Sequence, residues 1–105
     1  DTPNPDTLAD GLKTVLGSNT WPVVRDVVDA IITVDESAIA RATKLVWTRM
    51  KLCIEPSSGV GVAVLLSDAF RDQFPPDRYK RVGVILCGGN VDLAKAAKGF
   101  LLDDV

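Results

Sequence analysis

Hydrophobic and polar positions along the chain follow a helical period in several separate stretches. Valines at positions 23, 24, 27 and 28 share one face of a short predicted helix, with Thr20 as a possible N-cap and a proline in its first turn. A second helix is expected to begin after Asp35 or Ser37 and to end near Lys51, because apolar residues recur there at helical spacing. A last helix is predicted to begin at about Asp92.

Two other stretches are almost entirely apolar, which is typical of strands buried on both faces. They are residues 30–34 and residues 81–87. A third apolar stretch, residues 60–66, fits either a buried strand or a buried helix; we favour a helix that is capped by Ser57 or Ser58 and continues to Phe70. Residues 74–77 contain two prolines and are expected to form a loop.

The alternation of buried strands with helices indicates an α/β fold with a parallel sheet covered by helices. Two strands cannot satisfy their edges alone, because an independent sheet needs about three or more strands. We therefore expect this fold to be incomplete on its own, with the missing strands supplied by chain outside the sequence. Residues 1–6 are polar and interrupted by prolines, and we expect a linker or an ordered loop there.

Composition and charge narrow the class of protein. The chain has 105 residues, of which 47% are hydrophobic and 25% charged, as expected for one globular domain. Its net charge of −2 gives no reason to expect binding to nucleic acid or to an acidic membrane. No stretch resembles a membrane span or a signal peptide, so we expect a cytoplasmic protein. Because Met50 is the only methionine, we also expect a fragment, a processed piece or a trimmed chain.

The residue inventory excludes several kinds of catalytic site. The chain has no histidine, and its two cysteines, Cys53 and Cys87, do not form a C-x-x-C pair. A zinc site would therefore lack ligands, and a catalytic serine or cysteine would lack a histidine base. We predict no metal ligands in this chain. A disulfide is possible, but we favour two reduced, buried thiols for a cytoplasmic protein.

The turn after the second predicted strand is the first candidate site. Ligands of open parallel sheets bind at the carboxyl ends of strands, and Cys87-Gly88-Gly89-Asn90 lies at such an end. Glycines let the backbone approach a planar or anionic group closely, and the thiol and the amide side chain offer hydrogen bonds. The alternative is a tight turn with a buried thiol.

Two carboxylates mark further candidate positions. Asp10 precedes Gly11 in a short polar turn, which is either part of a cleft or a solvated turn. Glu55 precedes Pro56 and the buried apolar stretch. It either caps the positive end of a helix or faces a cleft as a carboxylate tuned by burial.

Four motifs taken together resemble the carboxyl-terminal third of enzymes of the serine/threonine dehydratase family, which use pyridoxal phosphate and have the fold type II architecture. The similarity runs in order from about residue 6 to residue 93 and is strongest to eukaryotic racemases of that family. The motifs are Asp10-Gly11-Leu12-Lys13, Asn19-Thr20-Trp21-Pro22, residues 51–61 (KLCIEPSSGVG) and residues 84–93 (VILCGGNVDL).

The resemblance implies roles for individual residues. Cys87 holds the position at which the family places a small hydroxyl or thiol against the pyridine nitrogen of pyridoxal 5′-phosphate. Gly11 and Gly88 would pack backbone against the cofactor, while Asp10 and Glu55 would line the catalytic cleft. A further pair, Lys51 and Asn90, matches positions associated with an activating nucleotide, ATP; Lys51 is otherwise a solvated helix end.

The resemblance also implies a reaction and partners. It implies interconversion of L-serine and D-serine, with β-elimination of serine to pyruvate and ammonia as a side reaction. Because racemases of the family usually have serine where this chain has Cys87, a serine or threonine dehydratase is the alternative. The implied partners are the amino-terminal remainder of the enzyme, a second identical subunit, and Mg²⁺ or Mn²⁺ as activator, with residues 1–105 forming the carboxyl-terminal part of one large catalytic domain.

Some features of that family are missing from the sequence. The chain has no Ser-x-Lys-x-Arg-Gly run that would carry the cofactor-binding lysine, and no glycine-rich phosphate cradle. Alone it should therefore not hold the cofactor in the usual way. From a different class, a noncatalytic interaction module is a further alternative, in which the end Asp103-Asp104-Val105 is captured by a peptide-binding domain.

Overall fold

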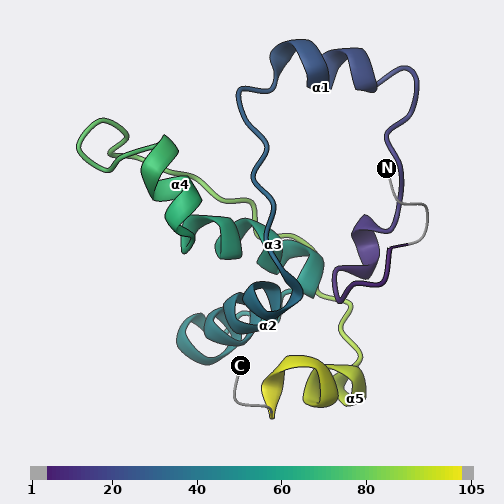
Figure 1. The fold of residues 1–105 in the computed structure, drawn as a ribbon. Helices are drawn as coiled ribbons and strands as arrows, with labels where there is room; N and C mark the ends of the chain where they lie inside the picture. Colours follow the sequence, from purple (N-terminus) through teal and green to yellow (C-terminus); the bar gives the residue numbers. More distant parts are fainter. Residues whose placement is uncertain (1–4, 103–105) are drawn as a thin grey trace.

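The computed structural model describes residues 5–102, which form short helices joined by long extended segments (Figure 1). The first four residues of the predicted lead and the acidic end, residues 103–105, lie outside the described residues. In chain order the elements are a 3₁₀ turn (Asp10–Leu12), α1 (Trp21–Val27), α2 (Glu36–Leu45) continued by a π-helical turn (Val46–Met50), α3 (Pro56–Leu65), α4 (Asp68–Gln73), and α5 (Leu93–Ala96) continued by a second π-helical turn (Ala97–Leu101).

Neither predicted strand forms within residues 5–102, so the prediction of a parallel sheet in this chain is wrong. Residues 30–34 and 81–87 are extended but pair with no neighbour. Alternate side chains in them are open to solvent, with Ile31 70% and Ile85 83% exposed, whereas Ile32, Val34, Val84 and Leu86 are half-buried. The physical reason is that a strand is defined by hydrogen bonds to a second strand, and the two extended segments do not bond to each other.

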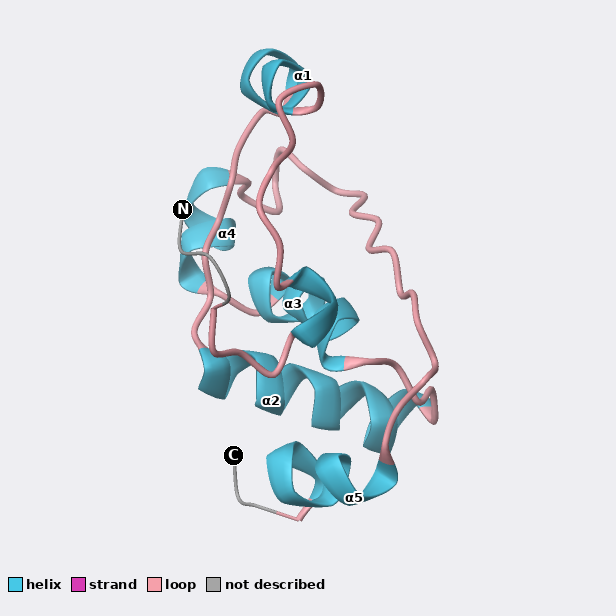
Figure 2. Ribbon diagram, turned by 90° about the vertical axis from the view of Figure 1, so that its right-hand side faces the viewer, coloured by secondary structure: helices cyan, strands magenta, loops and turns pink. Residues whose placement is uncertain are grey.

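The core lies where α2 contacts α3 on one side and α5 on the other (Figure 2). Against α3, the fully buried Thr43 packs next to Gly59, whose missing side chain permits the close approach. On the other side, the buried Phe100 of the second π-helical turn meets the ring of Trp47 in the first π-helical turn edge-on, with the ring centroids 5.4 Å apart. The indole Nε1 donates a hydrogen bond to the carbonyl of Ile54 at 2.8 Å, which ties the segment before α3 to the same core.

Local capping explains where α2 begins and ends. The Asp35 carboxylate accepts a hydrogen bond from the Ala38 amide at 2.7 Å, which confirms Asp35 as the cap. The π-helical turn ends at Met50 and is followed by Lys51, whose φ of 59° is left-handed, which confirms the prediction of a helix ending near Lys51.

Thr20 occupies the predicted N-cap position of α1, but its side chain makes no capping bond, because the hydroxyl donates to the Gly17 carbonyl at 3.2 Å. In α1 itself, Arg25 binds the neighbouring carboxylate of Asp26 at 2.7 Å and lowers the pKa of that carboxyl.

The helix predicted to continue to Phe70 is interrupted. α3 ends at Leu65, and Ser67 starts α4 by accepting a hydrogen bond from the Phe70 amide at 3.2 Å. The same hydroxyl donates to the Val64 carbonyl at 2.6 Å, which stabilises the end of one helix and the start of the next. Residues 60–65 of the predicted stretch are thus helical as predicted, whereas the separate α4 was not foreseen.

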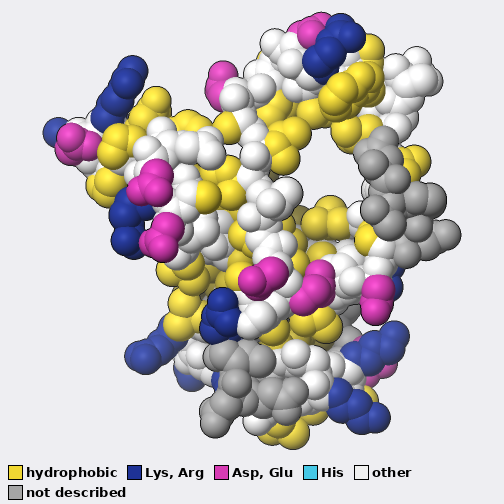
Figure 3. Space-filling model, in the orientation of Figure 1, with side chains coloured by type: hydrophobic (Ala, Val, Ile, Leu, Met, Phe, Trp, Pro, Cys, Tyr) yellow, Lys and Arg dark blue, Asp and Glu magenta, His cyan; other side chains and the backbone are white. Residues whose placement is uncertain are grey.

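Apolar side chains remain at the surface in several places (Figure 3). Cys53 and Cys87 are both free thiols, as predicted, but both are exposed, so the prediction that they are buried is wrong. Among the residues that the structure describes, no helix combines the length and the apolar character that crossing a bilayer requires.

Candidate functional site

The start of α3 holds two segments that are far apart in the sequence. The Ser57 Oγ accepts a hydrogen bond from the backbone amide of Gly11 at 3.0 Å. The neighbouring Ser58 Oγ accepts one from the backbone amide of Cys87 at 2.9 Å. Neither hydroxyl caps the helix, so the predicted capping role of these serines is wrong. Instead, the two serines bring the 3₁₀ turn and the glycine turn to the same helix end.

Glu55 makes the third connection. Its carboxylate Oε1 accepts a hydrogen bond from the backbone amide of Asn90 at 3.2 Å. Its position also explains Gly88, which has a left-handed φ of 77° and whose added Cβ would lie 2.6 Å from the carboxyl carbon of Glu55. Although Glu55 occupies the N-cap position of α3, its side chain makes no capping bond. Glu55 thus stands at the positive end of α3, as one alternative predicts, while its carboxylate bonds the turn at 88–90 instead of the helix amides.

A cavity of about 510 Å³ opens beside these contacts, between the 3₁₀ turn, the start of α3 and the start of α5. Its wall is apolar at Leu8, Val91 and Phe100. Three carboxylates, two ammonium groups and one amide also line it: Asp10, Glu55, Asp92, Lys13, Lys95 and Asn90. The mixture of opposite charges suits a small molecule that itself carries both signs.

Three of the seven predicted site residues line this cavity: Asp10, Glu55 and Asn90. Gly11, Cys87 and Gly88 do not line it, but they contact residues 55–58 at the start of α3. Lys51, the remaining predicted residue, is exposed at the end of the π-helical turn and does not line the cavity.

The sequence did not reveal Ser57 and Ser58 as anchors, although one signal was present. Proline is favoured at the first position of a helix, so Pro56 places the N-cap at Glu55 and leaves both serines inside the first turn. Serines at those positions are free to accept hydrogen bonds from other segments.

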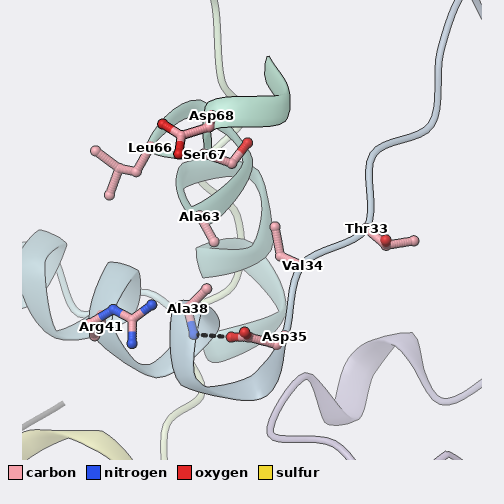
Figure 4. A pocket seen from close by; sticks show the side chains of 9 residues that line it. All are labelled: Thr33, Val34, Asp35, Ala38, Arg41, Ala63, Leu66, Ser67 and Asp68. Atoms are coloured by element: carbon pink, nitrogen blue, oxygen red, sulfur yellow. Dashed lines mark hydrogen bonds between the residues drawn. The ribbon is translucent and has the colours of Figure 1, made fainter. Parts of the chain in front are cut away.

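A second, smaller hollow of about 390 Å³ lies between the starts of α2 and α4 and the end of α3 (Figure 4). There the Asp35 carboxylate faces the Ala38 amide that it caps, and Arg41 donates to the Ser37 hydroxyl. None of the predicted site residues lines this hollow.

Comparison with known proteins identifies the class of protein. The chain belongs to the pyridoxal-phosphate dependent enzymes, whose family model matches residues 1–88. Within that family it is a homologue of serine racemase: it is 56% identical to the serine racemase of Bos taurus over 95 residues, which are 88% of this chain and 28% of that protein.

Solved structures agree with this assignment. The structure of maize serine racemase matches with a TM-score of 0.83 and 43% identity over 92% of this chain and 30% of that one. A pyridoxal 5′-phosphate-dependent aspartate racemase matches with a TM-score of 0.78 and 41% identity over 88% of this chain and 28% of that one. The chain therefore spans less than a third of the relatives it matches, and it is part of a fold type II enzyme.

The arrangement at the glycine turn fits one edge of a pyridoxal phosphate ring. The Cys87 thiol is exposed while its own amide is held by Ser58, so the sulfur is free to meet a ligand from a fixed position. A thiol is a weak hydrogen-bond donor and acceptor, which suits a pyridine nitrogen. The backbone amides of Gly11, Cys87 and Asn90 already donate to side chains of residues 55–58, so these three amides are not available to the phosphate.

Proposed function

We propose that this chain is the carboxyl-terminal part of a pyridoxal-phosphate-dependent serine racemase, which interconverts L-serine and D-serine. β-Elimination of serine to pyruvate and ammonia accompanies the racemisation. The observation that carries the proposal is the exposed Cys87, whose backbone amide donates to Ser58 at the same helix start as Glu55, which with Asp10 lines the cavity. The 56% identity to a serine racemase supports the choice of reaction.

Each residue has a physical task in this proposal. When bound, pyridoxal phosphate withdraws electrons from the α-carbon of an amino acid. The thiol of Cys87 would hold the ring nitrogen by a hydrogen bond, and a neutral partner of this kind would not force that nitrogen to remain protonated. Glu55 holds the turn at Gly88 in place, and the backbone at Gly11 forms the wall beside it. The carboxylate of Asp10 in the cavity wall is the group placed to accept a proton or to bind an ammonium group.

A serine or threonine dehydratase is the second candidate, because Cys87 stands where racemases usually have serine. It would use the same wall but release ammonia and a 2-oxo acid. Both reactions begin with removal of the α-proton, so one site supports both. This chain is also similar to an aspartate racemase. The features shared by these relatives therefore do not decide which amino acid is the substrate.

The assembly is part of the proposal. The amino-terminal remainder of the enzyme would supply the cofactor-binding lysine and the phosphate cradle, and a second identical subunit would complete a homodimer in the cytoplasm. Asn90 and Lys51 would contribute to an ATP site at the subunit interface, with Mg²⁺ or Mn²⁺ as a further activator. The family resemblance supports these assignments, and Asn90 lies in the cavity wall.

The test uses the full-length enzyme, in which residues 1–105 are joined to the amino-terminal remainder, with pyridoxal 5′-phosphate and L-serine. We call this polypeptide the full chain. Chiral chromatography measures D-serine, and a coupled assay measures pyruvate in the same sample. We expect both products, with D-serine in excess. Pyruvate without D-serine would replace the racemase with the dehydratase, and failure of the full chain to acquire the visible absorbance of bound cofactor would refute both.

A further inference from the structure

The segment that carries Cys87 has little of its own to hold it in place. Residues 81–87 pair with no strand in the part of the chain that the structure describes. The side-chain hydrogen bonds that reach the backbone of residues 81–91 there come from Ser58, at Cys87, and from Glu55, at Asn90. These two anchors stand three residues apart and enclose the left-handed Gly88.

The Ser58 anchor differs from an ordinary buried hydroxyl. Ser58 is only 4% exposed, and a buried hydroxyl inside a helix commonly bonds a carbonyl four residues earlier, as Thr43 does with Ile39 at 2.7 Å. For Ser58 that carbonyl would belong to Ile54, which instead accepts the Trp47 indole. The hydroxyl of Ser58 is therefore directed to a segment 29 residues away.

From this arrangement we propose that Ser58 is a positioning residue, which fixes the backbone of Cys87 and thereby places the thiol against the cofactor ring. The inference rests on the proposed function, since it assigns Ser58 a role that acts through the contact between Cys87 and the cofactor. Ser58 itself touches no substrate or cofactor.

The adjacent Ser57 supplies a matched control. It carries the same hydroxyl on the same helix turn, but its partner is the amide of Gly11. Ser57→Ala and Ser58→Ala therefore remove the same group from neighbouring residues and release different segments. A role limited to the stability of α3 would affect both variants in the same way.

The first measurement is amide hydrogen exchange in the full chain, which reports the opening of single hydrogen bonds. Ser58→Ala should speed exchange of the Cys87 amide about fivefold, the value for one hydrogen bond of typical strength, and leave the Gly11 amide unchanged. Ser57→Ala should do the reverse. Equal exchange of the Cys87 amide in Ser58→Ala and in the unmodified protein would overturn the inference.

The second measurement follows alkylation of Cys87 by iodoacetamide, with the exposed Cys53 as internal reference. Bound pyridoxal 5′-phosphate should slow alkylation of Cys87 in the unmodified full chain and in Ser57→Ala, whereas in Ser58→Ala this protection should fall about fivefold. Full protection in Ser58→Ala would overturn the inference while leaving the proposed function intact. Absence of protection in the unmodified protein would instead refute the contact between Cys87 and the cofactor, on which both depend.

A variant that retains the volume of the side chain covers the case in which Ser58→Ala does not fold. Ser58→Cys keeps a weaker acceptor at the same place. It should give the same pattern in both measurements with smaller changes, and exchange and protection equal to those of the unmodified chain would overturn the inference.

Discussion

The contact between Gly59 and Thr43 provides the sharpest test of how α2 and α3 pack. A Cβ added at Gly59 would lie 2.1 Å from the Thr43 Oγ1 and 3.3 Å from its Cβ. Thr43 is fully buried, and its hydroxyl donates to the Ile39 carbonyl at 2.7 Å. Gly59→Ala must therefore displace a side chain that has no free space around it.

The cost can be worked out from its parts. Overpacking a core costs about 1–3 kcal/mol, and leaving the displaced, buried hydroxyl of Thr43 without its partner costs about 1–3 kcal/mol. Alanine is a better helix former than glycine by about 1 kcal/mol, which offsets part of this. We expect Gly59→Ala to lower the free energy of unfolding by about 3 kcal/mol.

Urea denaturation of the full chain, followed by circular dichroism, measures this change, and a double-mutant cycle identifies its cause. In a Thr43→Ala background the nearest remaining atoms are at 3.3 and 3.5 Å, so adding Gly59→Ala should change stability by less than about 0.5 kcal/mol. An equal loss in both backgrounds would show that the clash with Thr43 is not the cause. A neutral Gly59→Ala would refute the close approach of the two helices.

Three further predictions concern the site and the start of α2. Cys87→Ala should raise the dissociation constant for pyridoxal 5′-phosphate about fivefold, the loss of one hydrogen bond, whereas Cys87→Ser should preserve it; fluorescence titration of the full chain compares them. Gly88→Ala should lower the free energy of unfolding by about 2–3 kcal/mol in urea denaturation, because its φ is left-handed and its Cβ would collide with the Glu55 carboxylate. Gly89→Ala should leave stability unchanged, because an added Cβ meets no atom within 4 Å. Asp35→Ala should lower the free energy of unfolding by about 1 kcal/mol in the same assay, because it removes the cap of α2. Ser37 is exposed, and Ser37→Ala should lower it by less than about 0.5 kcal/mol.

The helices were predictable because their signals are local. Asp35 caps α2 as its position before an apolar repeat predicts, and the left-handed Lys51 follows the end of that repeat. The break at Ser67 was missed because the apolar pattern continues to Phe70, although the serine carries the signal of a new cap. Helix propensity and capping depend on residues only a few positions apart in the chain, so they can be recognised in the sequence.

The site was predictable only in part, because its contacts are not local. Asp10, Glu55 and Asn90 were singled out from their motifs, and the structure places them around one cavity. Ser57 and Ser58 were assigned to capping, since no local pattern shows that a hydroxyl bonds an amide 46 or 29 residues away. Such pairings are set by how the helix end is oriented in the fold.

The segment 81–87 was wrongly predicted to be a strand, and its lack of strand pairing among residues 5–102 also explains why Cys87 needs anchors. A parallel strand is held by hydrogen bonds on both edges and by burial of both faces. In residues 81–87 neither is present, and Ile85 is 83% exposed, although burying such a side chain contributes about 1.5–3 kcal/mol. Within the described chain the position of Cys87 therefore depends on the hydroxyl of Ser58 and the carboxylate of Glu55. Neighbouring strands in the full enzyme would fix the direction of residues 81–87. Ser58 and Glu55 would still determine where the chain turns after Cys87.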